Sequence, residues 1–209
     1  MVFVILAIVF MLLLLNELIY KKTKKVNEIN RKFIHITVGS FIAFWPFLIS
    51  WQDIRFISLA FIIVVLISRK WNIFKGIHSV VRPTFGEILF AIAVGAITLI
   101  TSNKWIYLVA ILQMSLADGM AAIIGTIFGK NNSYNIFGQI KSIVGSLGFF
   151  VSSFLIFFIY SLSVVVKLPL YLMFNLALFL TFIENTGVYG LDNLLVPVLT
   201  VIFLKYYIK

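Results

Sequence analysis

Residues 115–153 read SLADGMAAIIGTIFGKNNSYNIFGQIKSIVGSLGFFVSS and contain most of the chemically useful side chains of the chain. Asp118 interrupts an apolar run that begins at Trp105. An ionisable side chain at membrane depth is costly and usually has a functional reason to be there. The alternative is a structural hydrogen bond between helices. We take Asp118 as the first candidate for a catalytic or metal-binding residue.

Small residues follow Asp118 at helical spacing, which would let another backbone or a ligand approach closely. They are Ala121, Ala122, Gly125 and Gly129. A polar loop then leads to Lys141 and to a second group of small residues on one helical face. This group contains Gly145, Gly148 and Ser152, with Ser142, Ser146 and Ser153 beside it. The stretch therefore predicts two small-residue helix faces that flank one polar loop.

The composition indicates a membrane protein. Of 209 residues, 62% are hydrophobic and 11% are charged, and the mean hydropathy is +1.12. Several apolar runs are long enough to span a bilayer, and they are continuously apolar, unlike the alternating strands of a β-barrel. The absence of cysteine excludes disulfides and cysteine-ligated metals. We expect one all-α integral membrane domain over residues 1–209, a polytopic bundle with its core motif in residues 105–166.

The apolar runs predict about seven to eight transmembrane helices. The expected spans are 2–20, 33–50, 54–68, 86–101, 105–128, 143–166, 169–183 and 191–204. Several of them are near the short end of spanning length. Either of the last two could be re-entrant, which leaves the count open between seven and eight.

The basic residues predict an orientation. With eight spans, twelve of the seventeen lysine and arginine residues fall on one side, in or beside the loops at 21–32, 69–85 and 129–141. By the positive-inside rule that side is cytoplasmic. The net charge of +10 is thus better explained by topology than by nucleic-acid binding. The polar candidates lie at the same side, so we expect an active site that faces the cytoplasm.

The central stretch resembles the membrane-embedded CTP-dependent lipid-alcohol kinases, such as dolichol, phytol and farnesol kinases and the yeast-type diacylglycerol kinase. The matching residues in the centre are Asp118, Gly119, Ala122, Gly125, Gly129, Lys130, Lys141, Ser142, Gly145 and Ser146. Further matches before and after it are Arg31, Lys32, His35, Gly39, Glu184, Asp192, Asn193 and Pro197. The resemblance therefore covers most of the chain.

The resemblance implies a set of site residues. It suggests that Asp118 and Asp192 hold Mg²⁺ or another divalent cation, with help from Asn193, and that Lys141 contacts phosphate. Glu184 or His35 would orient or deprotonate the acceptor alcohol, although His35 could instead be a structural histidine at the membrane interface. The residues expected to bind the nucleotide are Gly125, Gly129, Lys130, Ser142, Gly145 and Ser146.

Phosphate binding without a soluble nucleotide fold needs other donors. Gly125, Gly129 and Lys130 imitate a P-loop, but the spacing is one residue short, Asn131 replaces Ser or Thr, and the motif follows a helix. Helix N-termini, loop amides, lysines and a carboxylate-bound cation can do the same work. Phosphoryl transfer requires this combination of acids for Mg²⁺ and a cation for phosphate.

The function expected from these features is transfer of the terminal phosphate of a nucleoside triphosphate, CTP by resemblance, to a membrane lipid alcohol. The acceptor would be a polyprenol-type alcohol such as dolichol, phytol or farnesol, or diacylglycerol. A phosphatidate cytidylyltransferase, which makes CDP-diacylglycerol, has a related layout and is the alternative. A transporter or scaffold is a third possibility, but the chain shows no internal repeat of broken helices.

Overall fold

The computed structural model describes residues 1–23, 28–71 and 85–208 of the chain. Parts of two basic loops predicted to be cytoplasmic, residues 24–27 and 72–84, lie outside the described residues. The helices are α1 (Val2–Thr23), α2 (Glu28–Ala43), α3 (Trp45–Leu48), α4 (Trp51–Trp71), α6 (Gly86–Ile100), α7 (Lys104–Leu112), α8 (Asp118–Phe128), α9 (Ile143–Ser163), α10 (Leu170–Thr186) and α11 (Asp192–Tyr207). A π-helical turn, Gln113–Ala117, joins α7 to α8, and a 3-10 turn, Lys130–Asn132, follows α8.

Each predicted span is largely helical, and the all-α prediction is confirmed. Among the described residues, three helical segments are long and apolar enough to cross a membrane: Trp51–Trp71, Lys104–Phe128 and Ile143–Ser163. Shorter apolar helices, among them Gly86–Ile100 and Leu170–Thr186, make up much of the rest. The total of seven or eight spans stays a prediction.

The predicted second span, residues 33–50, is not one continuous helix. It breaks at Phe44 into α2 and the single turn α3. Pro46 lies at the start of α3, where its missing N–H is tolerated, whereas within a continuing α2 it would remove a backbone hydrogen bond. The break places Trp45, which is 3% exposed, in the interior of the bundle.

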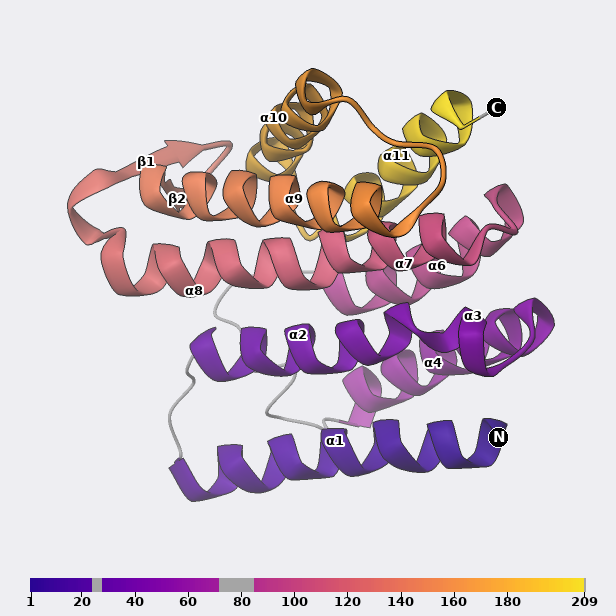
Figure 1. The fold of residues 1–209 in the computed structure, drawn as a ribbon. Coiled ribbons are helices and arrows are strands. Elements are labelled where there is room, and N and C mark those ends of the chain that lie inside the picture. Colours follow the sequence, from indigo (N-terminus) through magenta and orange to yellow (C-terminus); the bar gives the residue numbers. More distant parts are fainter. Residues whose placement is uncertain (24–27, 72–84, 209) are drawn as a thin grey trace.

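The segment predicted as a polar loop contains a β-hairpin. Strands β1 (Ser133–Ile136) and β2 (Gln139–Ser142) pair antiparallel, with Tyr134 opposite Lys141. Phe137 and Gly138 form the two-residue connection, and both have positive φ, as type I′ hairpin turns require. The Asn135 side chain accepts a hydrogen bond from the Gly138 amide and supports this turn. The hairpin projects from one end of the bundle, and both chain termini lie at the other (Figure 1).

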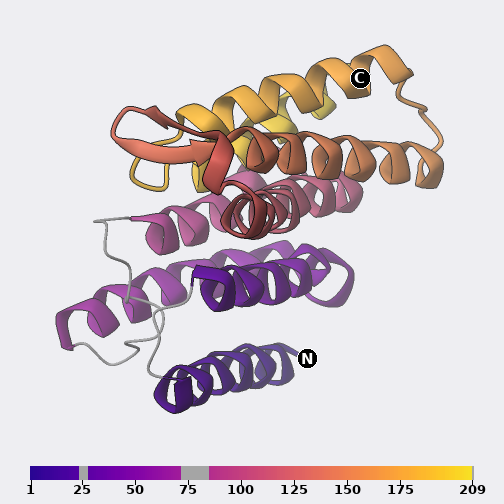
Figure 2. The same ribbon diagram turned by 90° about the vertical axis from the view of Figure 1, so that its left-hand side faces the viewer.

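The helix that runs from α7 through the π-helical turn into α8 lies at the centre of the bundle. It contacts α2 on one side and α9 and α11 on the other, and α1 packs outside α2 (Figures 1 and 2). Local capping fixes two helix starts: Asn103 accepts from the amides at the start of α7, and Ser142 accepts from the Gly145 amide at the start of α9. One buried apolar cluster extends from Ile5 in α1 to Leu204 in α11.

Candidate active site

Asp118 lies where the π-helical turn passes into α8, and it is 5% exposed. Such turns are rare and often occur at functional sites, because the extra residue changes which carbonyls are bonded. The Asp118 amide donates to the Ser115 carbonyl. The Met114 carbonyl, which would accept that bond in a regular α-helix, lies 3.2 Å from Nε2 of His35. The turn therefore presents a carboxylate and a backbone carbonyl to α2.

Two side chains of α2 face Asp118. Lys32 and His35 are three residues apart and so share one side of the helix. Lys32 Nζ lies 2.6 Å from Asp118 Oδ2, and His35 Nε2 lies 3.6 Å from the same oxygen. A Cβ at Gly39, one turn further along, would overlap Ser115, so glycine is needed for α2 to pack this close to the π-helical turn. Lys32, His35 and Gly39, which are among the residues that carry the resemblance, therefore all lie at the contact between α2 and the central helix.

Lys141 reaches the C-terminal end of α10 from the hairpin. Its Nζ forms an ion pair with Oε1 of Glu184 and also donates to the Glu184 carbonyl at 3.2 Å. Burial by itself would lower the pKa of Lys141, but attraction to Glu184 and Asp192 outweighs it and raises the pKa above its ordinary value. Lys141 is therefore a cation at neutral pH, although it is largely buried.

Three carboxylates converge between these two lysines. Ligand oxygens of Asp118, Glu184 and Asp192 lie within 4.8 Å of one another. Asp192 Oδ1 is buried and has no hydrogen-bond partner among the described residues. The three side chains would have to move closer together to hold one Mg²⁺, because the ion requires oxygen ligands at about 2.1 Å. Hard oxygen donors with one unpartnered oxygen fit Mg²⁺.

We call Asp118, Glu184, Asp192, Lys32 and Lys141 the acid–lysine cluster. Its three carboxylates and two ammonium groups leave one negative charge when His35 is neutral. A bound divalent cation would make the net charge of the cluster positive, and a positive site suits a polyphosphate ligand. The cluster therefore has the charge pattern of a site for a metal–nucleotide complex.

The predicted nucleotide-binding glycines have a clear packing role. Gly125, Gly129 and Gly145, together with Ser142, form a close contact between α8 and α9 that we call the glycine seam. A Cβ at Gly145 would lie 3.0 Å from the Ala121 carbonyl oxygen, and one at Gly129 would overlap the Gly125 carbonyl. The Ser142 hydroxyl is occupied by capping Gly145 at 3.1 Å. Phosphate binding by these residues stays a prediction.

A hydrogen-bonded network holds the hairpin on α10. Tyr134 donates to Asn185 Oδ1 at 2.7 Å, and its hydroxyl lies 2.6 Å from Ser146 Oγ, which itself donates to Asn185 at 2.8 Å. Residues directly opposite in a hairpin point to the same face. Tyr134 and Lys141 accordingly reach neighbouring residues of α10, so the network positions the strand that carries Lys141.

The remaining predicted residues lie apart from the carboxylates or have other partners. Lys130 is exposed in the 3-10 turn after α8. Asn193 Nδ2 donates to the Gly86 carbonyl at 3.0 Å. A role for Lys130 in nucleotide binding and a role for Asn193 in metal binding stay predictions.

Sequence reasoning gave no role to Lys32, Tyr134 or Asn185. The spacing of Lys32 and His35 was a usable signal, because it places both on one helix face. Alternation around Gly138 weakly indicated the hairpin that carries Tyr134. Asn185 had no signal beyond its place next to Glu184, because only the fold brings it to Ser146.

A largely apolar helical bundle with carboxylates and lysines buried at one point is typical of a membrane protein that has a site for charged groups. The chain is 30% identical over 189 residues to a phytol kinase of Synechocystis sp., a match that covers 87% of this chain and 80% of that protein. It therefore belongs to the polyprenol and phytol kinase family and has the general character of a lipid-alcohol kinase. No family model and no solved structure matches the chain.

Proposed function

We propose that the protein transfers the terminal phosphate of a nucleoside triphosphate to the hydroxyl of a membrane lipid alcohol of the phytol or polyprenol type. The convergence of three buried carboxylates and two lysines is the observation that carries this proposal. Phosphoryl transfer depends mainly on positioning and charge neutralisation, which such a cluster supplies. The 30% identity to a phytol kinase supports the acceptor class, and the motif resemblance supports CTP as the donor.

Asp118, Glu184 and Asp192 would hold a divalent cation, which neutralises phosphate charge and orients the donor when bound. Lys32 and Lys141 each pair with one of these carboxylates in the structure. In the proposed complex both amines exchange a carboxylate oxygen for a phosphate oxygen. The lysines then stabilise the charge that moves to the leaving nucleotide.

The acceptor hydroxyl is activated by His35 in this proposal. The alcohol oxygen bonds to the terminal phosphorus, the bond from that phosphorus to the bridging oxygen breaks, and the nucleoside diphosphate leaves. The hydroxyl proton passes to the imidazole, and the nearby Asp118 carboxylate, 3.6 Å from Nε2, stabilises the imidazolium. Glu184 is a weaker candidate for the base because, in this proposal, it would hold the divalent cation.

We further propose that the bundle is integrated in the bilayer with its hairpin end toward the cytoplasm. The charge asymmetry supports this orientation. Asn131 is exposed near the hairpin, whereas Gln52 is exposed at the start of α4. In this cysteine-free chain, Asn131→Cys should react with an impermeant thiol reagent only in inverted vesicles, and Gln52→Cys only in intact cells. The reverse pattern would invert the orientation.

The function is tested with the purified full-length protein in lipid nanodiscs. CTP labelled in the γ-phosphate or in the cytidine is supplied with phytol, longer polyprenols, diacylglycerol or phosphatidate. We expect γ-label on the prenol and release of CDP. Cytidine in the lipid with release of pyrophosphate would indicate a cytidylyltransferase instead. Absence of transfer to any lipid would overturn the kinase proposal.

A further inference from the structure

An apolar pocket of about 210 Å³ lies beside the acid–lysine cluster, between α1, α2, α4 and α6. Leu6 and Val9 of α1, Val38 of α2, Ile57 of α4 and Val94 of α6 contribute to its wall. Most of these side chains also belong to the buried apolar cluster. The pocket is therefore built into the bundle interior.

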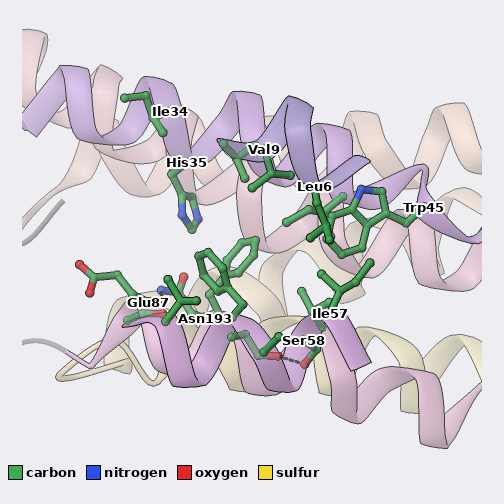
Figure 3. Close-up of a pocket in the computed structure, with 18 residues that line it drawn as sticks. Leu6, Val9, Ile34, His35, Trp45, Ile57, Ser58, Glu87 and Asn193 are labelled. Carbon is green, nitrogen blue, oxygen red and sulfur yellow. Dashed lines mark hydrogen bonds between the residues drawn. The ribbon is translucent and has the colours of Figure 1, made fainter. Parts of the chain in front are cut away.

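The polar groups of the pocket gather at one end. His35, Glu87 and Asn193 lie at that end, and Trp45 lies at the opposite end (Figure 3). Ser58 lines the middle, but its hydroxyl donates to the Ala91 carbonyl at 2.7 Å. The pocket thus has one polar end and an apolar body, the polarity of a molecule with one head group and one hydrocarbon chain.

The polar end is continuous with the acid–lysine cluster through His35. The imidazole lines the pocket, and its Nε2 lies 3.6 Å from Asp118 Oδ2. A hydroxyl placed beside His35 would therefore be next to the carboxylates that we assign to the metal and nucleotide.

The dimensions favour a single chain. His35 lies eight residues before Ala43, the end of α2, which is about 12 Å along the helix, and Trp45 follows the break at Phe44. The pocket therefore extends over roughly half of a ~30 Å hydrocarbon core. At roughly 30 Å³ for each water-sized group, the volume accommodates about seven such groups, enough for one chain in single file and too few for two chains side by side. Leu6 lines the pocket beside Trp45 and is 41% exposed, so the rest of a long chain can leave toward the bilayer at the Trp45 end (Figure 3). Val64 of α4 is a second exposed part of the wall, at 44%.

We propose that this pocket binds the proximal part of a single-chain lipid alcohol, with the hydroxyl at His35 and the chain directed along α2 and α6 toward Trp45. The proposal rests on the proposed kinase function and deepens it, because it selects linear isoprenoid alcohols over diacylglycerol. Diacylglycerol carries two acyl chains beside its hydroxyl and would have to place both in a slot for one.

The test uses the full-length protein in nanodiscs without nucleotide and a linear isoprenoid alcohol that carries a photoreactive diazirine. We expect cross-links to α2, α4 and α6, displaced by unlabelled isoprenol and much less by diacylglycerol. Cross-links confined to other helices would overturn the pocket assignment. Equal displacement by diacylglycerol would overturn the single-chain selectivity.

Variants that fill the pocket, each compared with a control variant outside it, test the assignment by kinetics. Val94→Phe narrows the buried wall, whereas Ile92→Phe adds the same group to α6 outside the pocket. Val94→Phe should reduce cross-linking and raise the KM for isoprenol by roughly tenfold or more, the usual scale for an obstructed apolar site, and leave the nucleotide KM unchanged. Ile92→Phe should change neither value. If Val94→Phe does not fold, Val64→Phe at the open side, with its neighbour Ile63→Phe as the control, replaces it.

The outcomes separate the two proposals. Cross-linking in the pocket without phosphate transfer by the native protein would remove the kinase function and leave a lipid-binding site. Phosphate transfer that Val94→Phe and Val64→Phe both leave unchanged would keep the kinase and place its acceptor elsewhere.

Discussion

The acid–lysine cluster and the glycine seam are built from overlapping stretches of the chain, yet they differ in how well their polar groups are satisfied. In the seam, a carbonyl oxygen, a hydroxyl or a Cα lies close to the position that a Cβ would take on each glycine. The Ser142 hydroxyl already accepts a hydrogen bond from the Gly145 amide. In the cluster, three carboxylates share a small volume and Asp192 Oδ1 has no partner among the described residues.

This difference distinguishes residues that act through helix packing from residues that act in the chemistry of the site. The seam is complete without a ligand, so its residues act by setting the distance between α8 and α9. The cluster carries a charge imbalance that a metal and a phosphate would relieve. Variants in the cluster should therefore affect chemistry without unfolding the protein, and variants in the seam should affect folding first.

The largest effect is expected for Asp118→Asn. The amide keeps the shape and can still accept a hydrogen bond from Lys32, but it removes charge from the metal site. Loss of several kcal/mol of transition-state stabilisation, at about 1.36 kcal/mol per tenfold, predicts a decrease in kcat of about 100-fold or more. Asp53→Asn, at the start of α4, is the matched control. Near-normal turnover by a folded Asp118→Asn would make Asp118 structural.

Lys141→Met should have the next largest effect and distinguish the two substrates. A hydrogen bond from a charged group contributes about 1.5–3 kcal/mol, which predicts a rise in the nucleotide KM of about 10- to 100-fold and little change for the alcohol. Lys167→Met, an exposed position at the end of the bundle away from the hairpin, is the control. A change confined to the alcohol KM would assign Lys141 to the acceptor instead.

Gly145→Ala tests the seam. The added Cβ would lie 3.0 Å from the Ala121 carbonyl oxygen and 3.3 Å from Gly125 Cα, and such overpacking costs about 1–3 kcal/mol. We expect a lower thermal midpoint and a loss of activity in proportion to the unfolded fraction. Gly125→Ala meets milder contacts, with 3.0 Å to the Ser142 hydroxyl and 3.5 Å to Gly145 Cα, and should lower the midpoint less. A large loss of kcat at an unchanged midpoint would instead assign the seam to catalysis.

Tyr134→Phe should have the smallest effect. It removes the hydroxyl that bonds Asn185 and Ser146, worth about 1 kcal/mol, so the strand that carries Lys141 becomes less firmly held. We expect a rise of about fivefold in the nucleotide KM at unchanged alcohol KM. Tyr171→Phe, an exposed tyrosine of α10, should be silent. If both tyrosine variants behave alike, the network does not position Lys141.

The sequence by itself determined the helical class, the approximate positions of the helical segments and the three carboxylates of the candidate site. It could do so because continuous apolar runs need helices, and because Asp118, Glu184 and Asp192 are conspicuous in so apolar a chain. The predicted span 143–166 also begins where α9 begins, because the apolar run starts there, and in the structure Ser142 is the N-cap residue of this helix.

Only the tertiary structure decided which residues meet. Lys32 contacts Asp118, 86 positions away, and Lys141 contacts Glu184, 43 positions away, and neither distance leaves a trace in local spacing. The π-helical turn before Asp118, which contacts α2, was not predicted from the sequence either. The glycines of the seam show the same limit, because close approach of a ligand and close approach of a helix both require a missing Cβ. The structure shows their contact between α8 and α9, and phosphate binding by them stays a prediction.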